Sequence, residues 1–154
     1  MADVSELIIE YLALFLALML VMPLHEFAHA FAAVKSGDDT PRLAGRYTLN
    51  PFAHFDLIGL LMLLVARFGW AKPVPINPYN FRNLKWGYFW TSIAGVLTNL
   101  ITAFLIYPVY VLFTRYIVFD FLLFDELFII FLWFVYAISL NLVVFNLIPV
   151  YPLD

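Results

Sequence analysis

The residues best suited to chemistry lie together in the stretch MPLHEFAHAFAAVK, residues 22–35. His25, Glu26 and His29 form the pattern H-E-x-x-H inside a run that is otherwise apolar. On a helix, side chains at positions i and i+4 project over the same face, so the two imidazoles can hold one metal ion. Glu26 lies one step round the helix, where its carboxylate can reach a water on that metal without being a ligand. The pattern therefore predicts a zinc site.

The chemistry of such a site depends on how many protein groups hold the metal. Zinc with three protein ligands keeps a fourth position for water, whose pKa falls to about 7. Glu26 can take a proton from that water and pass it to a leaving amine, which is the chemistry of peptide-bond hydrolysis. The candidates for the third ligand are His54 and Asp154, the last residue of the chain.

A structural role is the alternative for the cluster, because a lone buried histidine is more often a hydrogen-bonded core residue than a ligand. Here, however, three ionisable side chains share one turn of an apolar helix. Each costs about 2.5 kcal/mol or more in its charged form at the centre of a bilayer. A structural role would need several separate compensating partners, so we favour the metal site.

Composition places the chain in the membrane. Of its 154 residues 65% are hydrophobic and 12% charged, whereas soluble domains contain roughly 45 to 50% apolar residues. The absence of cysteine excludes thiolate ligands and disulfides. The eight lysines and arginines form no basic tract, so we expect a lipid bilayer and no nucleic acid among the partners.

The apolar runs predict an all-α membrane protein whose core is three long transmembrane helices. A fourth run, residues 57–66, is too short for a crossing and predicts a re-entrant or interfacial helix. RLAGRYTLN alternates like a strand, and the prolines of GWAKPVPINPYNFRN impose extended chain, so we expect a small β-like hairpin or extended segment. The long helices are expected at residues 7–34, 86–113 and 126–147.

The positions of the basic residues predict the orientation, since seven of the eight lie between the first two long helices. By the positive-inside rule this middle segment is cytoplasmic and the N-terminus is outside. Three crossings then bring Asp154 to the cytoplasmic side, where the histidine-bearing half of the first helix lies. A fourth crossing would place Asp154 on the opposite side. The three-crossing topology and a ligand set of His25, His29 and Asp154 therefore support each other.

Several motifs together resemble one family. HEFAH in a membrane helix, AGVLTN in the next and NLIPVYPLD at the end of the third resemble the site-2 protease family of intramembrane zinc metalloproteases. GRYTLNPFAHFD and GWAKPVPINPYNFRN are similar to its small, compact prokaryotic branch. The resemblance covers the chain from about residue 20 to residue 154 and is more specific than H-E-x-x-H alone, which soluble zincins share.

The resemblance implies roles for individual residues. His25, His29 and Asp154 would bind one Zn²⁺, Glu26 would be the catalytic base, and Asn146 would steady the oxyanion. The substrate would be a transmembrane segment of another protein, cleaved in regulated intramembrane proteolysis, and the protein would lie in a prokaryotic cell membrane with its active site toward the cytoplasm.

The sequence departs from the family pattern at two places. Val96 stands where the family motif A-G-P-x-x-N has proline. This replacement removes no metal ligand. The family continues L-D-G after the last motif and usually adds a further helix, whereas this sequence ends at Asp154. We therefore expect a single protease core domain over residues 1–154, truncated just after the third metal ligand.

Alternatives stay open at this stage. One is a non-hydrolytic metal-binding membrane protein, a transporter or pseudoprotease, which would have no need of a base at Glu26; another is a structural adaptor without metal. For His54 and Asp56 we weigh a place around the zinc or a substrate gate against hydrogen bonding at the NP turn. Interhelical hydrogen bonding is the commoner use of Asn99. A homo-oligomer is also compatible with the sequence.

Overall fold

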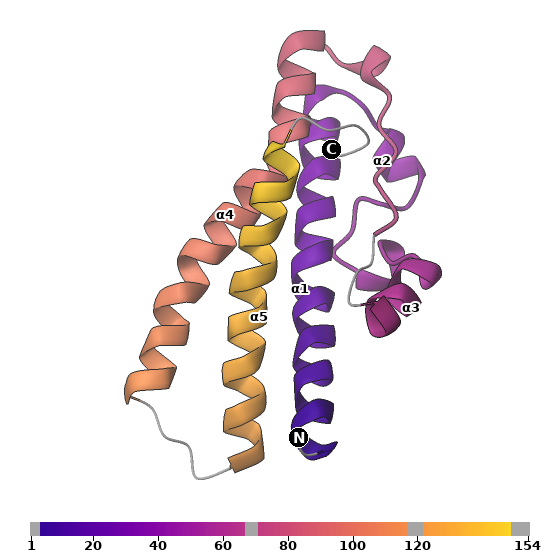
Figure 1. Ribbon diagram of the computed structural model, residues 1–154. Helices are drawn as coiled ribbons and strands as arrows, with labels where there is room; N and C mark the ends of the chain where they lie inside the picture. Colours follow the sequence, from indigo (N-terminus) through magenta and orange to yellow (C-terminus); the bar gives the residue numbers. More distant parts are fainter. Residues whose placement is uncertain (1–3, 67–70, 117–121, 149–154) are drawn as a thin grey trace. The chain divides into compact units, whose positions relative to one another are not determined.

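The computed structural model describes residues 4–66, 71–116 and 122–148 (Figure 1). Within these ranges the chain is helical and forms no strand, which confirms the expected all-α class. The α-helices are α1 (Val4–Ser36), α2 (Thr40–Leu43), α3 (Leu57–Ala66), α4 (Leu84–Tyr116) and α5 (Leu122–Leu147), and two 3-10 turns are η1 (Pro51–Ala53) and η2 (Pro78–Asn80).

Three of these helices, α1, α4 and α5, are long and apolar enough to cross a membrane. They correspond to the three long helices predicted from the apolar runs, and they support a membrane protein. Helix α3 has the predicted bounds and only ten residues, about 15 Å at 1.5 Å per residue, against a hydrocarbon core of about 30 Å. Its length therefore fits the expected short element better than a fourth crossing.

The chain forms two compact units, and α1 and α4 each contribute to both. The first unit comprises residues 1–21 and 99–154, and the second comprises residues 22–98. In the first unit, Ala17 and Val21 of α1 pack with Val135 of α5 in a fully buried apolar cluster. Small residues at such contacts let membrane helices approach closely, which is how they associate without a hydrophobic driving force.

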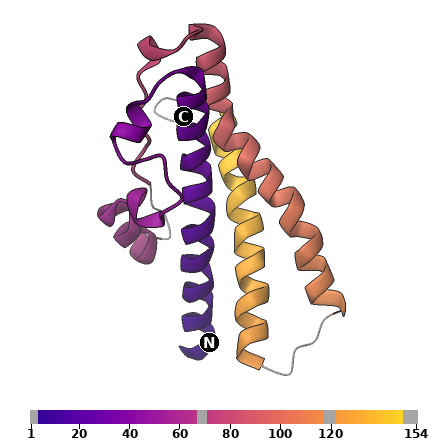
Figure 2. The same cartoon turned by 180° about the vertical axis from the view of Figure 1, so that it is seen from behind.

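In the second unit, the chain that follows α1 forms short elements and loops, which lie on one side of that helix in Figures 1 and 2. Polar side chains begin these elements: Asn50 accepts a hydrogen bond from Phe52 N at η1, and Asn77 accepts one from Tyr79 N at η2. Asp56 accepts from the first amides of α3, Ile58 N and Gly59 N. Asx caps of this kind set where a helix starts.

The predicted hairpin is not confirmed in the described residues. Pro41 lies in the first turn of the short α2, and the turn that follows contains Gly45 at φ 68°. Arg46 is buried, and its guanidinium donates to the carbonyl of Ala53. These local contacts override the alternating pattern, and the described pairing is one isolated antiparallel bridge between Phe55 and Ala71. Residues 72–77, between the bridge at Ala71 and η2, form no helix or strand, and Asn77 has the extended backbone that the prolines predicted.

Candidate metal centre

The two histidines of the H-E-x-x-H pattern meet inside the second unit. His25 and His29 lie one turn apart on α1 and are 2% and 5% exposed. Their Nε2 atoms are 3.1 Å apart, and the rings meet edge to face. The helix therefore brings the two imidazoles together as the spacing predicted.

The backbone of α4 fixes the orientation of His29. Its Nδ1 lies 2.7 Å from the carbonyl oxygen of Thr91. A carbonyl oxygen only accepts, so Nδ1 carries the proton and, in the neutral ring, Nε2 keeps a lone pair that faces His25. A carbonyl partner of this kind is what usually orients a metal-binding histidine and increases its basicity. Sequence patterns do not single out Thr91, because the contact uses its backbone carbonyl.

Gly95 of α4 provides the space in which the two imidazoles lie. A Cβ built at this position would approach both His25 and His29 to less than 3.0 Å, a separation that real Cβ atoms essentially never show. Glycine is thus required here by close approach rather than by backbone conformation.

The two imidazoles fit a tetrahedral zinc ion. Nitrogen ligands at about 2.0 to 2.1 Å from tetrahedral zinc lie about 3.3 Å apart, close to the 3.1 Å between the two Nε2 atoms. Among the residues that the structure describes, no group of three histidine, cysteine, aspartate or glutamate side chains forms a site. Asp154, the predicted third ligand, lies outside the described residues, and its role stays a prediction.

Glu26 is turned toward a different neighbour from the histidines. It is 7% exposed, and its Oε2 accepts a hydrogen bond from Val74 N at 3.3 Å. Val74 belongs to the segment 71–77. At about 100° per residue, Glu26 lies beside the histidine face of α1 rather than within it, as a base that is not a ligand requires.

Two residues that the sequence left open have structural contacts. His54 is fully buried, and its Nε2 lies 2.8 Å from the carbonyl oxygen of Thr48. Asp56 caps α3. These contacts match the hydrogen-bonding alternative around the NP turn.

Asn99 and Asn146, the two asparagines considered for the site from the sequence, belong to the first unit. Asn99 is fully buried on α4 and Asn146 is half-buried near the end of α5. The role of Asn146 at the site stays a prediction.

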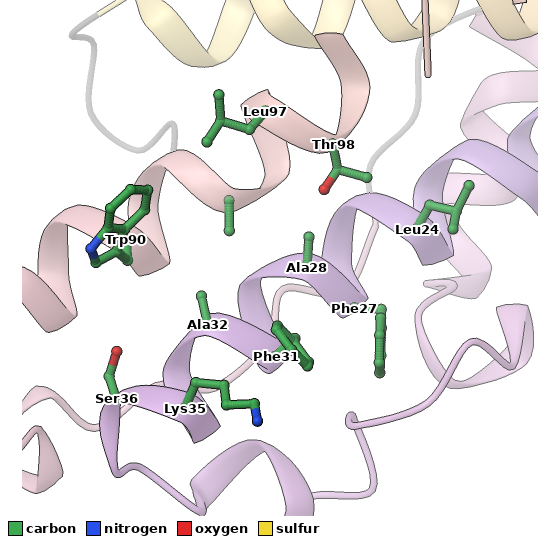
Figure 3. A pocket seen from close by; sticks show the side chains of 11 residues that line it. Leu24, Phe27, Ala28, Phe31, Ala32, Lys35, Ser36, Trp90, Leu97 and Thr98 are labelled. Atoms are coloured by element: carbon green, nitrogen blue, oxygen red, sulfur yellow. The ribbon is translucent and has the colours of Figure 1, made fainter. Parts of the chain in front are cut away.

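An apolar groove of about 640 Å³ is lined by residues of α1 and α4 (Figure 3). Leu24, Phe27 and Phe31 contribute from a face of α1 that is roughly opposite Glu26, at about 100° per residue. Trp90 and Leu97 contribute from α4.

The chain was compared with known proteins. It is 42% identical over 147 residues to "Putative zinc metalloprotease YwhC" of Bacillus subtilis (strain 168). No model of a known protein family matches the chain, and neither does any solved structure. The match includes 92% of this chain and 64% of the relative. The chain is therefore homologous to a protein named as a zinc metalloprotease, and it spans about 64% of that protein's length.

Proposed function

We propose that the chain is the core of an intramembrane zinc metalloprotease of the site-2 type. The observation that carries the proposal is the pair of buried imidazoles, 3.1 Å apart, with one oriented by a backbone carbonyl and both set against a glycine. The name of the Bacillus subtilis relative supports zinc and proteolysis. Three helices of membrane-spanning length support a substrate that is itself in the membrane.

The residues divide the work of hydrolysis between them. His25 and His29, with Asp154 as the predicted third ligand, would hold zinc, which when bound polarises the scissile carbonyl and lowers the pKa of a water. Glu26 would take a proton from the attacking water as the new C–O bond forms. It would then give that proton to the amine nitrogen as the C–N bond breaks. Asn146 would donate to the oxyanion.

The substrate we propose is a transmembrane segment of another protein, cut near the cytoplasmic face in regulated intramembrane proteolysis. A helix satisfies its own backbone hydrogen bonds, so it must be partly unwound before its carbonyl can reach a metal. The groove between α1 and α4 has mostly apolar walls, and the ammonium of Lys35, a charged residue of its lining, lies 5.5 Å from the centre of the Phe31 ring. Such walls favour an apolar segment over a charged peptide.

The test compares the chain with Glu26→Gln in liposomes that contain a panel of transmembrane substrates. Glu26→Gln should keep stoichiometric zinc, measured by metal analysis, and lower the cleavage rate by at least about 100-fold, because it removes the proton acceptor. Glu6→Gln, an exposed glutamate at the start of α1, is the matched control and should cleave normally. Zinc binding without cleavage of any substrate by the unaltered chain would instead favour a metal-binding protein without hydrolytic activity.

A further inference from the structure

A buried carboxylate links the end of α1 to the start of η2. Asp38 is fully buried and lies just after Gly37, whose φ of 112° turns the chain out of the helix. Its Oδ1 accepts hydrogen bonds from Thr40 N at 3.0 Å, Thr40 Oγ1 at 2.5 Å and Asn80 Nδ2 at 2.8 Å. Its Oδ2 accepts one from Asn77 N at 2.7 Å. An ionised carboxylate only accepts, and here it meets four donors.

The four donors decide the charge state of Asp38. Burial raises the pKa of this carboxyl, but hydrogen bonds from Thr40, Asn77 and Asn80 outweigh burial and hold the pKa below its ordinary value. The group is therefore ionised at neutral pH, and its hydrogen bonds are of the stronger, charge-assisted kind.

The other end of the segment 71–77 is held as well. Lys72 N donates to the carbonyl of His54 at 2.9 Å. The buried guanidinium of Arg46 donates to the carbonyls of Ala53 and Pro73, the second at 3.3 Å. The segment is thus fixed at Lys72 and Pro73 on one side and at Asn77 on the other.

The amide that contacts Glu26 lies between these anchors. Proline occupies positions 73 and 75, so Val74 carries the one N–H between Lys72 and Ile76. That N–H donates to Glu26 Oε2 at 3.3 Å. Any slippage of the segment at Asn77 would move this donor away from the carboxylate.

We propose that Asp38 is a positioning residue for Glu26: by holding Asn77, it keeps the Val74 N–H against the Glu26 carboxylate. The Glu26 carboxylate then keeps a fixed position beside the histidines. Asp38 itself touches neither Glu26 nor substrate. The inference rests on the proposed role of Glu26 as the base. It assigns the segment 71–77 to the support of that base.

The test is Asp38→Asn, which replaces one acceptor oxygen by an NH₂ group. That NH₂ donor would then face another hydrogen-bond donor, so the hydrogen bond at that position would be lost. Amide hydrogen exchange of the peptide over residues 72–79 should become at least about tenfold faster, since the variant weakens the charge-assisted hydrogen bond from Asn77 N. The kcat for a transmembrane substrate should fall at least about tenfold with KM nearly unchanged, because the base is displaced while substrate binding is not. Zinc stoichiometry should be retained.

The matched control is Asp39→Asn, which makes the same charge change one residue away. Asp39 is exposed and forms a surface ion pair with Arg42 at 3.0 Å, so exchange and cleavage should both stay at the level of the unaltered chain. Unchanged exchange at residues 72–79 in Asp38→Asn would overturn the proposal. Faster exchange with an unchanged kcat would overturn it equally.

A milder pair of variants covers the case in which Asp38→Asn does not fold. Thr40→Val removes one donor to Asp38, and Thr40→Ser retains it. Exchange over residues 72–79 should be faster in the valine variant than in the serine variant, and equal rates would contradict the proposal. If the unaltered chain cleaves no substrate, the proposed function fails, whereas the exchange measurements still decide whether Asp38 anchors the segment.

Discussion

The two units of the chain bury different kinds of side chain. The buried side chains of the first unit are mainly small and apolar, such as Ala13, Ala17 and Val135. The second unit buries the following ionisable or hydrogen-bonding residues: His25, Glu26, His29, Asp38, Arg46, His54 and Thr91. Apolar packing therefore dominates the first unit, while directed polar contacts dominate the second, which contains both histidines and Glu26.

The difference has an energetic reason. A buried charge without partners costs several kcal/mol in a membrane protein, so such groups persist where hydrogen bonds or a bound ion compensate them. Arg46 donates to two carbonyls, and Asp38 accepts four hydrogen bonds. A small change in this unit should therefore shift His25, His29 or Glu26, whereas a comparable change at the buried apolar contacts of the first unit should affect mainly stability.

Among the substitutions that compare the two units, the largest effect on zinc affinity is expected from Gly95→Ala, which adds one methyl group to the second unit. The new Cβ would overlap both imidazoles, and His29 cannot move away without losing its 2.7 Å contact with Thr91 O. Zinc affinity should fall at least about tenfold, and overpacking should cost about 1 to 3 kcal/mol of unfolding free energy. Metal titration and thermal unfolding would measure the two effects.

Ser92→Ala is the control for this substitution, because Ser92 lies on the same helix and is exposed. It should leave zinc affinity unchanged. If Gly95→Ala bound zinc as tightly as the unaltered chain, the imidazoles would have to be arranged differently from the pair described above.

The sequence predicted the elements of this fold more fully than it predicted the contacts between them. The three long helices and the bounds of α3 follow from apolar length, and the pairing of His25 with His29 follows from helical period. The bond from Val74 N to Glu26 joins residues 48 positions apart, and the bond from Asn77 N to Asp38 joins residues 39 apart. Such contacts depend on the tertiary path of a loop, which local patterns do not encode.

A smaller effect, on the stability of the fold, is expected when the pH is lowered. Since the pKa of Asp38 is lowered in the folded chain, its stabilisation is complete above the unfolded pKa of about 3.9 and is lost as pH falls through the folded value. Thermal unfolding between pH 6 and pH 3 should show that the stability difference between the chain and Asp38→Asn narrows below about pH 4. With Asp39→Asn as the reference variant, no such convergence should appear. A difference that stays constant with pH would show that the Asp38 carboxylate contributes nothing through its charge.

The smallest effect is expected in the first unit, at Ser139. Its hydroxyl is fully buried on α5 and has no hydrogen-bond partner among the described residues. Removing a buried polar group that lacks a partner costs no hydrogen bond and relieves its desolvation, so Ser139→Ala should change the unfolding free energy by less than about 1 kcal/mol, toward higher stability. Zinc affinity and cleavage should not change. A loss of zinc binding or of cleavage in Ser139→Ala would contradict this expectation, because the Ser139 hydroxyl would then contribute to the site and not only to the packing of α5.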